Sequence, residues 1–311
     1  MNDNRASLTR SAALASITVA VVLVAIKSWA SWKTGSAAML GSLADSALDL
    51  VASLATLVGV WIAAQPADRN HRFGHGKAEA VAALVQIVLI ALSAFGIATR
   101  SIHQLLQGAR VSAPEEGIGV SLFAILLTLA LLAWQRHVIA RTRSVAIRTD
   151  HLHYKSDLLL NLAVIAALAL DAFMGFALAD PLFGLAIAGW LAWGARKAAS
   201  EVVAQLMDKE WPEDKRRDFV KRAARHPELA KMHDLRTRTS GAHDFAQFHV
   251  DLPAEMTVEE AHVIIERVEQ DLLEAFPGTD ILIHIDPQGH VDEPGNPLVE
   301  ADEFKQLKDP I

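Results

Sequence analysis

Six long apolar segments occupy the first two-thirds of the chain and constrain its fold more than any other feature. They lie near residues 11–32, 38–63, 78–99, 118–138, 145–172 and 181–205. An α-helix of about 20 mostly apolar residues crosses the hydrocarbon core of a bilayer and satisfies its own backbone polar groups there. The sequence therefore predicts an all-α bundle of six transmembrane helices. The fifth segment is the least apolar, because charged residues and histidines crowd its beginning.

Lysine and arginine residues give the expected orientation in the membrane, since they concentrate on the cytoplasmic side. With a cytoplasmic N-terminus, the inner side carries Arg5, Arg10, Arg69, Arg72, Lys77, Arg136, Arg141, Arg143, Arg148, Arg196, Lys197 and Lys209. The outer side then carries Lys33, Arg100 and Arg110. We expect both termini in the cytoplasm, in the inner membrane of a bacterium-like cell. No cleavage site follows the N-terminal residues, so no removable signal peptide is expected.

The remainder of the chain has the composition of a soluble domain. Residues 212–227 and 257–276 read as amphipathic helices, and the second ends at Pro277 and Gly278. Two alternating segments meet at Gly241 and Ala242 as a hairpin, and "TDILIHIDP" reads as a third strand. We predict a transmembrane domain over residues 1–207 and an αββαβ domain over 208–287. Residues 288–311 are acidic and are expected to form a disordered tail.

Charge and cysteine content exclude several kinds of partner and site. The net charge is −7, which gives no support to nucleic-acid binding. The chain contains no cysteine, which excludes disulfides and thiolate metal sites. Any bound metal must therefore be held by histidine nitrogens and carboxylate oxygens.

Two pairs of polar residues lie inside apolar segments. Asp45 and Asp49 in the second segment, and His153 and Asp157 in the fifth, are each four residues apart and so share a helix face. A charged residue at the centre of a membrane helix costs about 2.5–3.5 kcal/mol. A polar helix-packing pair is one explanation, but a cation site accounts better for this cost. Four nitrogen and oxygen ligands suit Zn²⁺ best, permit Cd²⁺ and Fe²⁺, and leave Mn²⁺ open.

These motifs, with six spans and a small αββαβ domain, resemble the cation diffusion facilitator family over nearly the whole chain to about residue 287. The resemblance implies a ferredoxin-like cytoplasmic domain. It also implies a homodimeric, proton-coupled exporter of divalent metal, with Zn²⁺ the main substrate. By this likeness, the transport site consists of Asp45, Asp49, His153 and Asp157.

A second cluster lies in the loop between the second and third apolar segments. Asp68, His71 and His75 have a spacing that fits a weaker metal site, and the family resemblance assigns them that role. Solvated loop histidines are the alternative. The resemblance also pairs Lys77 with Asp208 in a salt bridge near the membrane surface. The alternative for Lys77 is a side chain that extends along the membrane to reach water.

A third cluster lies in the soluble domain. His284 and Asp286 are two residues apart on one strand and so share a face. The resemblance implies a binuclear zinc site at the dimer interface, bridged by the aspartate. Its ligands are His233, His249, His262, His284 and Asp286. We leave His151, His226, His243 and His290 outside these sites.

The predicted mechanism exchanges metal for protons. Ligands must lose their protons to bind metal, so binding on the cytoplasmic side releases protons, and protons from the outer side displace the metal. Two alternatives belong to other classes of protein. An intramembrane metallohydrolase lacks the H-E-x-x-H motif and, with four protein ligands, has no open position for water. A membrane metal sensor leaves the costly intramembrane residues unexplained.

Overall fold

The computed structural model describes residues 2–34, 37–107, 118–174, 176, 178–229 and 232–289. These form two compact units, one from Asp3 to Val203 and the other from Ala204 onward. The division falls inside a helix. Residues 290–311, which make up most of the predicted tail, lie outside the described part of the chain.

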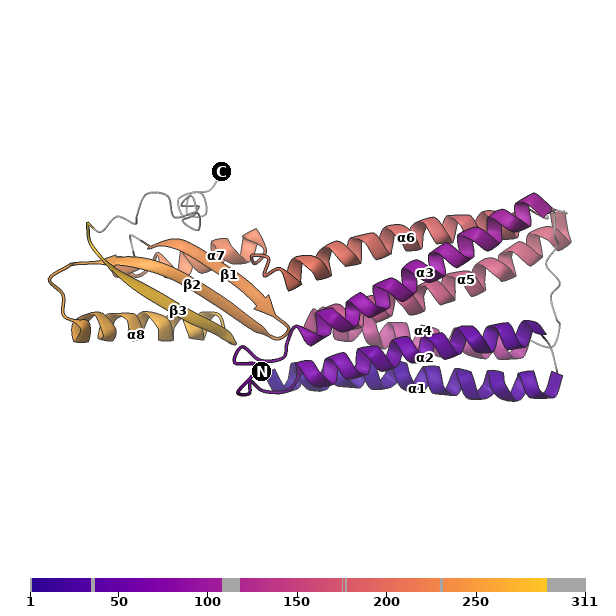
Figure 1. Ribbon diagram of the computed structural model, residues 1–311, viewed down its shortest axis with the longest axis horizontal. Coiled ribbons are helices and arrows are strands. Elements are labelled where there is room, and N and C mark those ends of the chain that lie inside the picture. The colour runs from indigo at the N-terminus through magenta and orange to yellow at the C-terminus, as the bar shows by residue number, and fades with distance from the viewer. Residues whose placement is uncertain are drawn as a thin grey trace. The chain divides into compact units, whose positions relative to one another are not determined.

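Six long helices build the first unit (Figure 1). They are α1 (Asn2–Thr34), α2 (Ala37–Ala63), α3 (Ala78–Gln107), α4 (Ile118–Thr142), α5 (Val145–Met174) and α6 (Ala179–Leu206). Helix α5 packs against α2, α3 and α4, and α2 also packs against α3. Helix α5 therefore contacts three other helices, which shield its buried residues Asp150 and His153.

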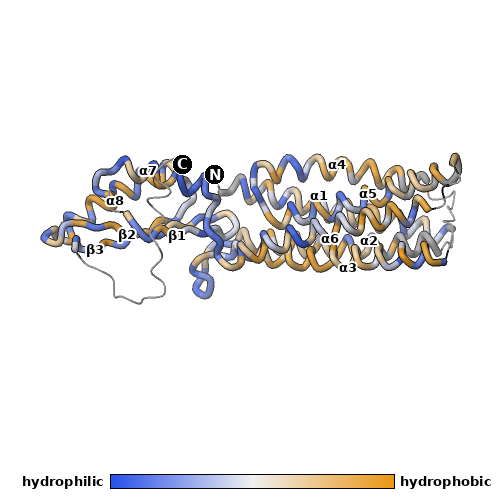
Figure 2. The backbone as a smooth tube through the Cα atoms, turned by 90° about the horizontal axis from the view of Figure 1, so that it is seen from above, coloured by the Kyte–Doolittle hydropathy of each residue, from blue (hydrophilic) through white to orange (hydrophobic). Residues whose placement is uncertain are grey.

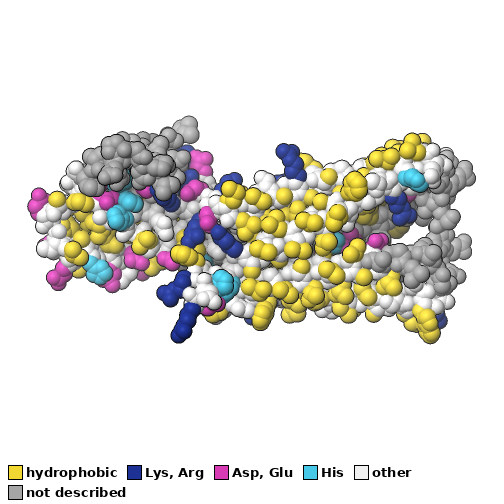
Figure 3. All heavy atoms as spheres, in the orientation of Figure 1, with side chains coloured by type: hydrophobic (Ala, Val, Ile, Leu, Met, Phe, Trp, Pro, Cys, Tyr) yellow, Lys and Arg dark blue, Asp and Glu magenta, His cyan; other side chains and the backbone are white. Residues whose placement is uncertain are grey.

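Within the described residues, four helices are long and apolar enough to cross a membrane: α1, α2, α3 and α4. Helices α5 and α6 are also long, and each contains an uncharged stretch, residues 158–170 of α5 and residues 181–195 of α6. The expectation of a membrane-spanning helical region is met, while the count of six spans stays a prediction. Figures 2 and 3 show hydrophobic residues along these helices and over their outer surface, as a lipid-facing surface requires.

Small residues allow the close approach of α3 to two other helices. A Cβ atom added to Gly59 on α2 would lie 2.3 Å from the Cβ of Ala82 on α3. A Cβ atom added to Gly184 on α6 would lie 2.2 Å from the Oγ of Ser101 on α3. Small residues at such contacts are typical of helices that pack in membranes.

The second unit contains a three-stranded sheet with helices on one face. Its elements are α7 (Glu213–Ala223), the short 3₁₀ helix η2 (Pro227–Leu229), β1 (Met232–Ser240), β2 (His243–Leu252), α8 (Val258–Ala275) and β3 (Thr279–Pro287). The strand order is β1-β2-β3, with β1 antiparallel and β3 parallel to β2. The predicted αββαβ order and hairpin are present, and Gly241 has the positive φ of 60° that its turn needs.

The helix predicted over residues 212–227 ends earlier than expected. Helix α7 stops at Ala223, and a 3₁₀ turn follows from Pro227. A proline disfavours helical backbone angles at the preceding residue, so the chain leaves the α-helix before it reaches Pro227.

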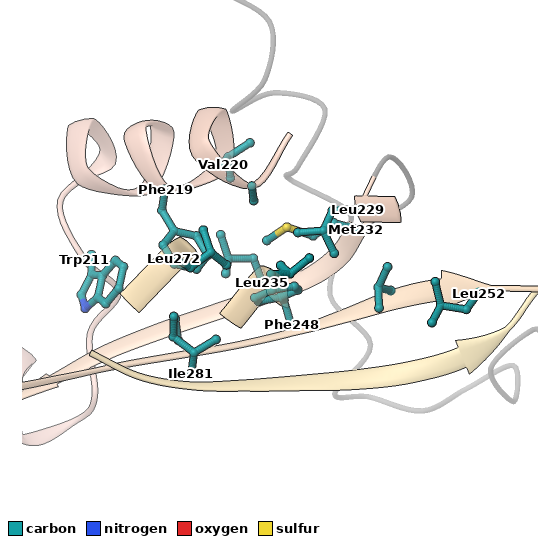
Figure 4. Close-up of a cluster of buried hydrophobic side chains, with 14 of the residues drawn as sticks. Trp211, Phe219, Val220, Leu229, Met232, Leu235, Phe248, Leu252, Leu272 and Ile281 are labelled. Atoms are coloured by element: carbon teal, nitrogen blue, oxygen red, sulfur yellow. The ribbon is translucent and has the colours of Figure 1, made fainter. Parts of the chain in front are cut away.

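The core of this unit lies between the sheet and the two helices (Figure 4). Phe219 from α7, Phe248 from β2 and Leu272 from α8 are all at most 1% exposed. Because side chains alternate along a strand, the residues beside Phe248 point to the other face of the sheet. That other face carries the histidines.

Candidate metal sites

The packing of α2 against α5 brings together three of the four residues predicted for the membrane site. His153 Nε2 lies 3.0 Å from Asp49 Oδ1 and 3.8 Å from Asp157 Oδ2. One ligand atom from each of the three lies within 4.8 Å of the others. His153 is 6% exposed, so this group is largely shielded from solvent. The arrangement offers one nitrogen and two oxygen ligands to a single cation.

Asp157 carries a buried oxygen that lacks a hydrogen-bond partner. Its Oδ2 is shielded from solvent and has no hydrogen-bond partner among the described residues. Leaving a buried carboxylate oxygen unsatisfied is costly, and a bound cation would remove that cost. The three residues therefore fit a divalent metal.

Asp45 lies one helical turn from Asp49 and outside this group. Its side chain is exposed. The adjacent Ser46 instead accepts a hydrogen bond of 2.6 Å from the ammonium of Lys27 on α1. The structure thus brings together three of the four predicted ligands and leaves Asp45 apart.

A buried carboxylate one turn from His153 was not among the predicted site residues. Asp150 is fully buried and accepts hydrogen bonds from Ser16 on α1 at 2.5 Å, Gln86 on α3 at 2.8 Å and Gln135 on α4 at 2.7 Å. These bonds tie α5 to three neighbouring helices. Two sequence features could have identified this residue. Asp150 lies three residues before His153, and its glutamine partners lie inside apolar segments, where glutamine is rare.

The loop before α3 brings its three predicted residues together. Asp68 Oδ2 lies 3.4 Å from His75 Nε2, and Asp68 Oδ1 lies 3.3 Å from His71 Nδ1. The two histidine rings lie close together and tilted to one another, with His75 Nε2 3.1 Å from His71 Nδ1. Gly74, with a φ of 79°, lets the loop turn back on itself. Backbone N–H groups of His71 and Asn70 donate to Asp68 and lower the pKa of its carboxyl, which keeps it ionised as a ligand.

The sheet aligns three histidines in one row across its strands. His249 on β2 is the register partner of both His233 on β1 and His284 on β3. Asp286 lies beside them, with its Oδ2 2.9 Å from His249 Nδ1 and 3.6 Å from His233 Nε2. The Oδ1 of Asp286 lies 3.3 Å from His284 Nε2. Each carboxylate oxygen thus faces different histidines, an arrangement that suits an aspartate bridging two metal ions.

His262 lies apart from these four residues. It is exposed on α8, while the neighbouring Ala261 is buried against the core on the opposite face of the sheet from the histidine row. Asp234, which the sequence reasoning missed, lies beside the row instead. A β-bulge between His233 and Arg236 gives Asp234 a φ of 49° and places its Oδ2 3.8 Å from His249 Nε2.

The predicted salt bridge between Lys77 and Asp208 joins residues of separate units and stays a prediction. Lys77 directly precedes α3. Asp208 has a φ of 55°, and its Oδ1 lies 3.6 Å from Nη1 of Arg238 on β1.

Comparison with known proteins matches both parts of the chain. The family model described as the cation efflux transmembrane domain covers residues 13–207, and that of the cytoplasmic domain of cation efflux proteins covers residues 211–288. Relatives named cation-efflux pump FieF are similar over most of their length. The one from Cronobacter sakazakii is 42% identical over 287 residues, which is 92% of this chain and 95% of the relative. The one from Pectobacterium carotovorum is 42% identical over 293 residues, or 94% of this chain and 97% of the relative.

The relative from Yersinia pestis strain Pestoides F is 43% identical over 287 residues, again 92% of this chain and 95% of its own. The family resemblance inferred from the sequence motifs is therefore confirmed. The chain belongs to the cation diffusion facilitator family of cation-efflux proteins.

Proposed function

We propose that the chain exports divalent metal cations from the cytoplasm in exchange for protons. Zn²⁺ is the main substrate, and Cd²⁺ and Fe²⁺ are also carried. The observation that carries this proposal is the group formed by Asp49, His153 and Asp157, in which one shielded carboxylate oxygen accepts no hydrogen bond from the described residues. The relatives named as pumps support transport and give no support to a metallohydrolase.

Proton coupling is proposed from the position of His153. Its Nε2 lies between two carboxylates, where a proton on the ring offsets part of their negative charge. A metal ion that binds the same nitrogen needs a neutral imidazole, so it must displace that proton. Metal and proton thus compete for one position, which is what exchange requires.

Asp45 is proposed as the fourth ligand, which joins when metal binds. It lies on the same face of α2 as Asp49, four residues away, and its exposed side chain is available to rotate. With Asp45 in place, the ion has one nitrogen and three oxygen ligands.

Six membrane spans, an inner-membrane location and cytoplasmic termini complete the proposed topology. The clustering of lysine and arginine at one set of helix ends supports this orientation. The loop formed by Asp68, His71 and His75 then lies on the cytoplasmic side, where we propose a weaker metal site. Lys77 and Asp208 are proposed to pair near the same membrane surface.

The sheet unit is proposed to hold zinc at the interface of a homodimer. Within one chain, the side chains of His233, His249, His284 and Asp286 lie close enough together to bind zinc. His262 is exposed on α8 and can join a site of this kind from a second copy. Metal binding here would tighten the dimer and report cytoplasmic metal to the membrane unit.

Zinc uptake into proteoliposomes that contain zinc-sensitive and pH-sensitive dyes tests the proposal. Wild type should take up zinc while protons leave, so the internal pH should rise. Asp157→Asn should show neither change. Asp180→Asn, which removes a carboxylate at the start of α6, is the matched control and should transport normally. Equal uptake by Asp157→Asn would refute the site, whereas uptake without a pH change would refute only the proton coupling.

A further inference from the structure

A groove between α5 and α6 lies outside all the metal sites. Its volume is about 280 Å³, and its lining is mostly apolar. Leu152, Trp190 and Trp193 contribute large apolar surfaces, while Arg148, Lys155 and Lys197 contribute positive charge. Gly194 lets the helices approach at this groove, because a Cβ atom added there would lie 3.3 Å from Leu152 Cδ2.

The charge in the groove favours an anion. Arg148 pairs with Glu201, so these two charges offset each other. Lys155 lies with its Nζ 5.3 Å from the ring centroid of Trp190, and neither Lys155 nor Lys197 has a carboxylate partner among the described residues. Two ammonium groups therefore line the groove without a counter-charge. A divalent cation would be repelled from it, which argues against a role in metal entry.

The groove lies where both helices change from apolar to charged. Residues 181–195 of α6 carry no charge, and Arg196 and Lys197 follow. On α5, Lys155 and Asp157 precede the uncharged residues 158–170. In the proposed topology, Lys155 and Lys197 lie in the cytoplasmic halves of α5 and α6. Long lysine side chains can extend from there toward the headgroup region, where tryptophan is also common.

We propose that this groove binds an anionic glycerophospholipid, with its phosphate between Lys155 and Lys197 and the start of an acyl chain along Trp190 and Trp193. Basic pockets between membrane helices on the cytoplasmic side bind lipid headgroups of this kind. The proposal rests on the proposed membrane topology. It does not rest on transport, and its test measures binding alone.

Native mass spectrometry of the detergent-purified full chain, titrated with phosphatidylglycerol or phosphatidylcholine, tests the proposal. Wild type should bind phosphatidylglycerol more tightly than phosphatidylcholine. Lys155→Gln and Lys197→Gln should each weaken phosphatidylglycerol binding about fivefold, because the attraction of one lysine to an anionic lipid changes the affinity by about that factor. Arg196→Gln is the matched control, because it removes the adjacent positive charge from α6 outside the groove lining.

Three results would overturn the proposal. Equal binding of the two lipids by wild type would show that the groove does not select an anionic headgroup. Equal losses in Arg196→Gln and Lys197→Gln would show a general effect of charge. Displacement of the lipid by millimolar inorganic phosphate would show a site for a free anion. Thermal unfolding of each variant identifies any that fails to fold, and Lys155→Gln and Lys197→Gln serve as independent tests in that case.

Discussion

His153 on α5 lies 3.0 Å from Asp49 on α2, so the two helices share a ligand pair across their contact. Sliding of one helix along the other would separate these two side chains. In the proposed transport cycle, a small movement of α5 would therefore change the metal site, because its ligand atoms come from both helices.

We predict that Asp49→Asn and Asp45→Asn differ in thermal stability without zinc, while both lose zinc affinity. Asp49 already contacts His153, so its replacement should lower the midpoint of thermal unfolding without zinc. Asp45 stands outside the group, so Asp45→Asn should leave that midpoint unchanged. Both variants should lose zinc affinity by at least about tenfold, the low end of what losing a metal-site partner costs. Differential scanning fluorimetry with and without zinc measures this, and a full zinc-induced shift in Asp45→Asn would show that Asp45 is not a ligand.

We predict that the hydrogen-bond network at Asp150 stabilises the helical unit. Gln135→Leu removes a donor from the buried Asp150 carboxylate and should cost about 1–3 kcal/mol. Gln107→Leu changes the same residue type at an exposed position on α3 and should have little effect. Thermal unfolding in detergent makes the comparison. Equal midpoints for the two variants would mean that Asp150 does not depend on its donors.

We predict a steric conflict when Gly59 is enlarged. The added Cβ of Gly59→Ala would lie 2.3 Å from the Cβ of Ala82, so the variant should lose about 1–3 kcal/mol of stability. Ala82→Gly in the same chain should restore most of it. Gly96→Ala is the control, since nothing lies within 4 Å of a Cβ there. Failure of Ala82→Gly to rescue would place the cost elsewhere than at this contact.

We predict that acid weakens the contact between α7 and α8. His226 and Arg222 on the α7 side bind Asp271 on α8 and lower the pKa of its carboxyl. A lowered folded-state pKa means that the stabilisation is fully present above the ordinary value of about 3.9 and is lost as the pH falls through the folded value.

Asp271→Asn should therefore reduce protection of α7 and α8 amides by about 1 kcal/mol at pH 7 and by less near pH 3. Hydrogen exchange of the full chain, corrected for the intrinsic rate at each pH, measures both differences. Equal differences at the two pH values would contradict the ionic origin of this contact.

We predict that His249→Ala and His262→Ala affect the sheet unit in different ways. His249 lies at the centre of the histidine row, so its loss should abolish zinc binding by this unit. His262→Ala should retain a zinc ion on the row and lose only the zinc-dependent tightening of the dimer. Sedimentation with and without zinc, with His243→Ala as an exposed control, distinguishes them. A dimer that still tightens with zinc in His262→Ala would remove His262 from the site.

Predicted site residues that lie close together within one helix or one loop are those whose spacing is fixed by local geometry. The spacing of His153 and Asp157 guarantees a shared helix face, and the close spacing of Asp68, His71 and His75 keeps them in one loop. Whether these residues contact residues on other elements depends on how the elements pack. The family resemblance supplied Asp49 opposite His153, but helical spacing alone could not show that Asp45 stays outside the group.

Other features depend on contacts between residues far apart in the chain, and the sequence does not identify those partners. Asp150 lies in a hydrogen-bond network whose donors come from three other helices, 15 to 134 residues away in the chain. Asp234 approaches His249 only because a bulge interrupts the pairing of β1 with β2. The end of α7 could have been anticipated more closely, since Pro227 restricts the residue before it.

The row of histidines also sets an order of events during synthesis. His284 of this row and the neighbouring Asp286 lie on β3, and they reach His249 only after α8 has returned the chain to the sheet. The zinc site proposed for this unit therefore stays incomplete until β3 has been synthesised and has paired with β2. Zinc capture there would distinguish chains that have completed the sheet from chains truncated before β3.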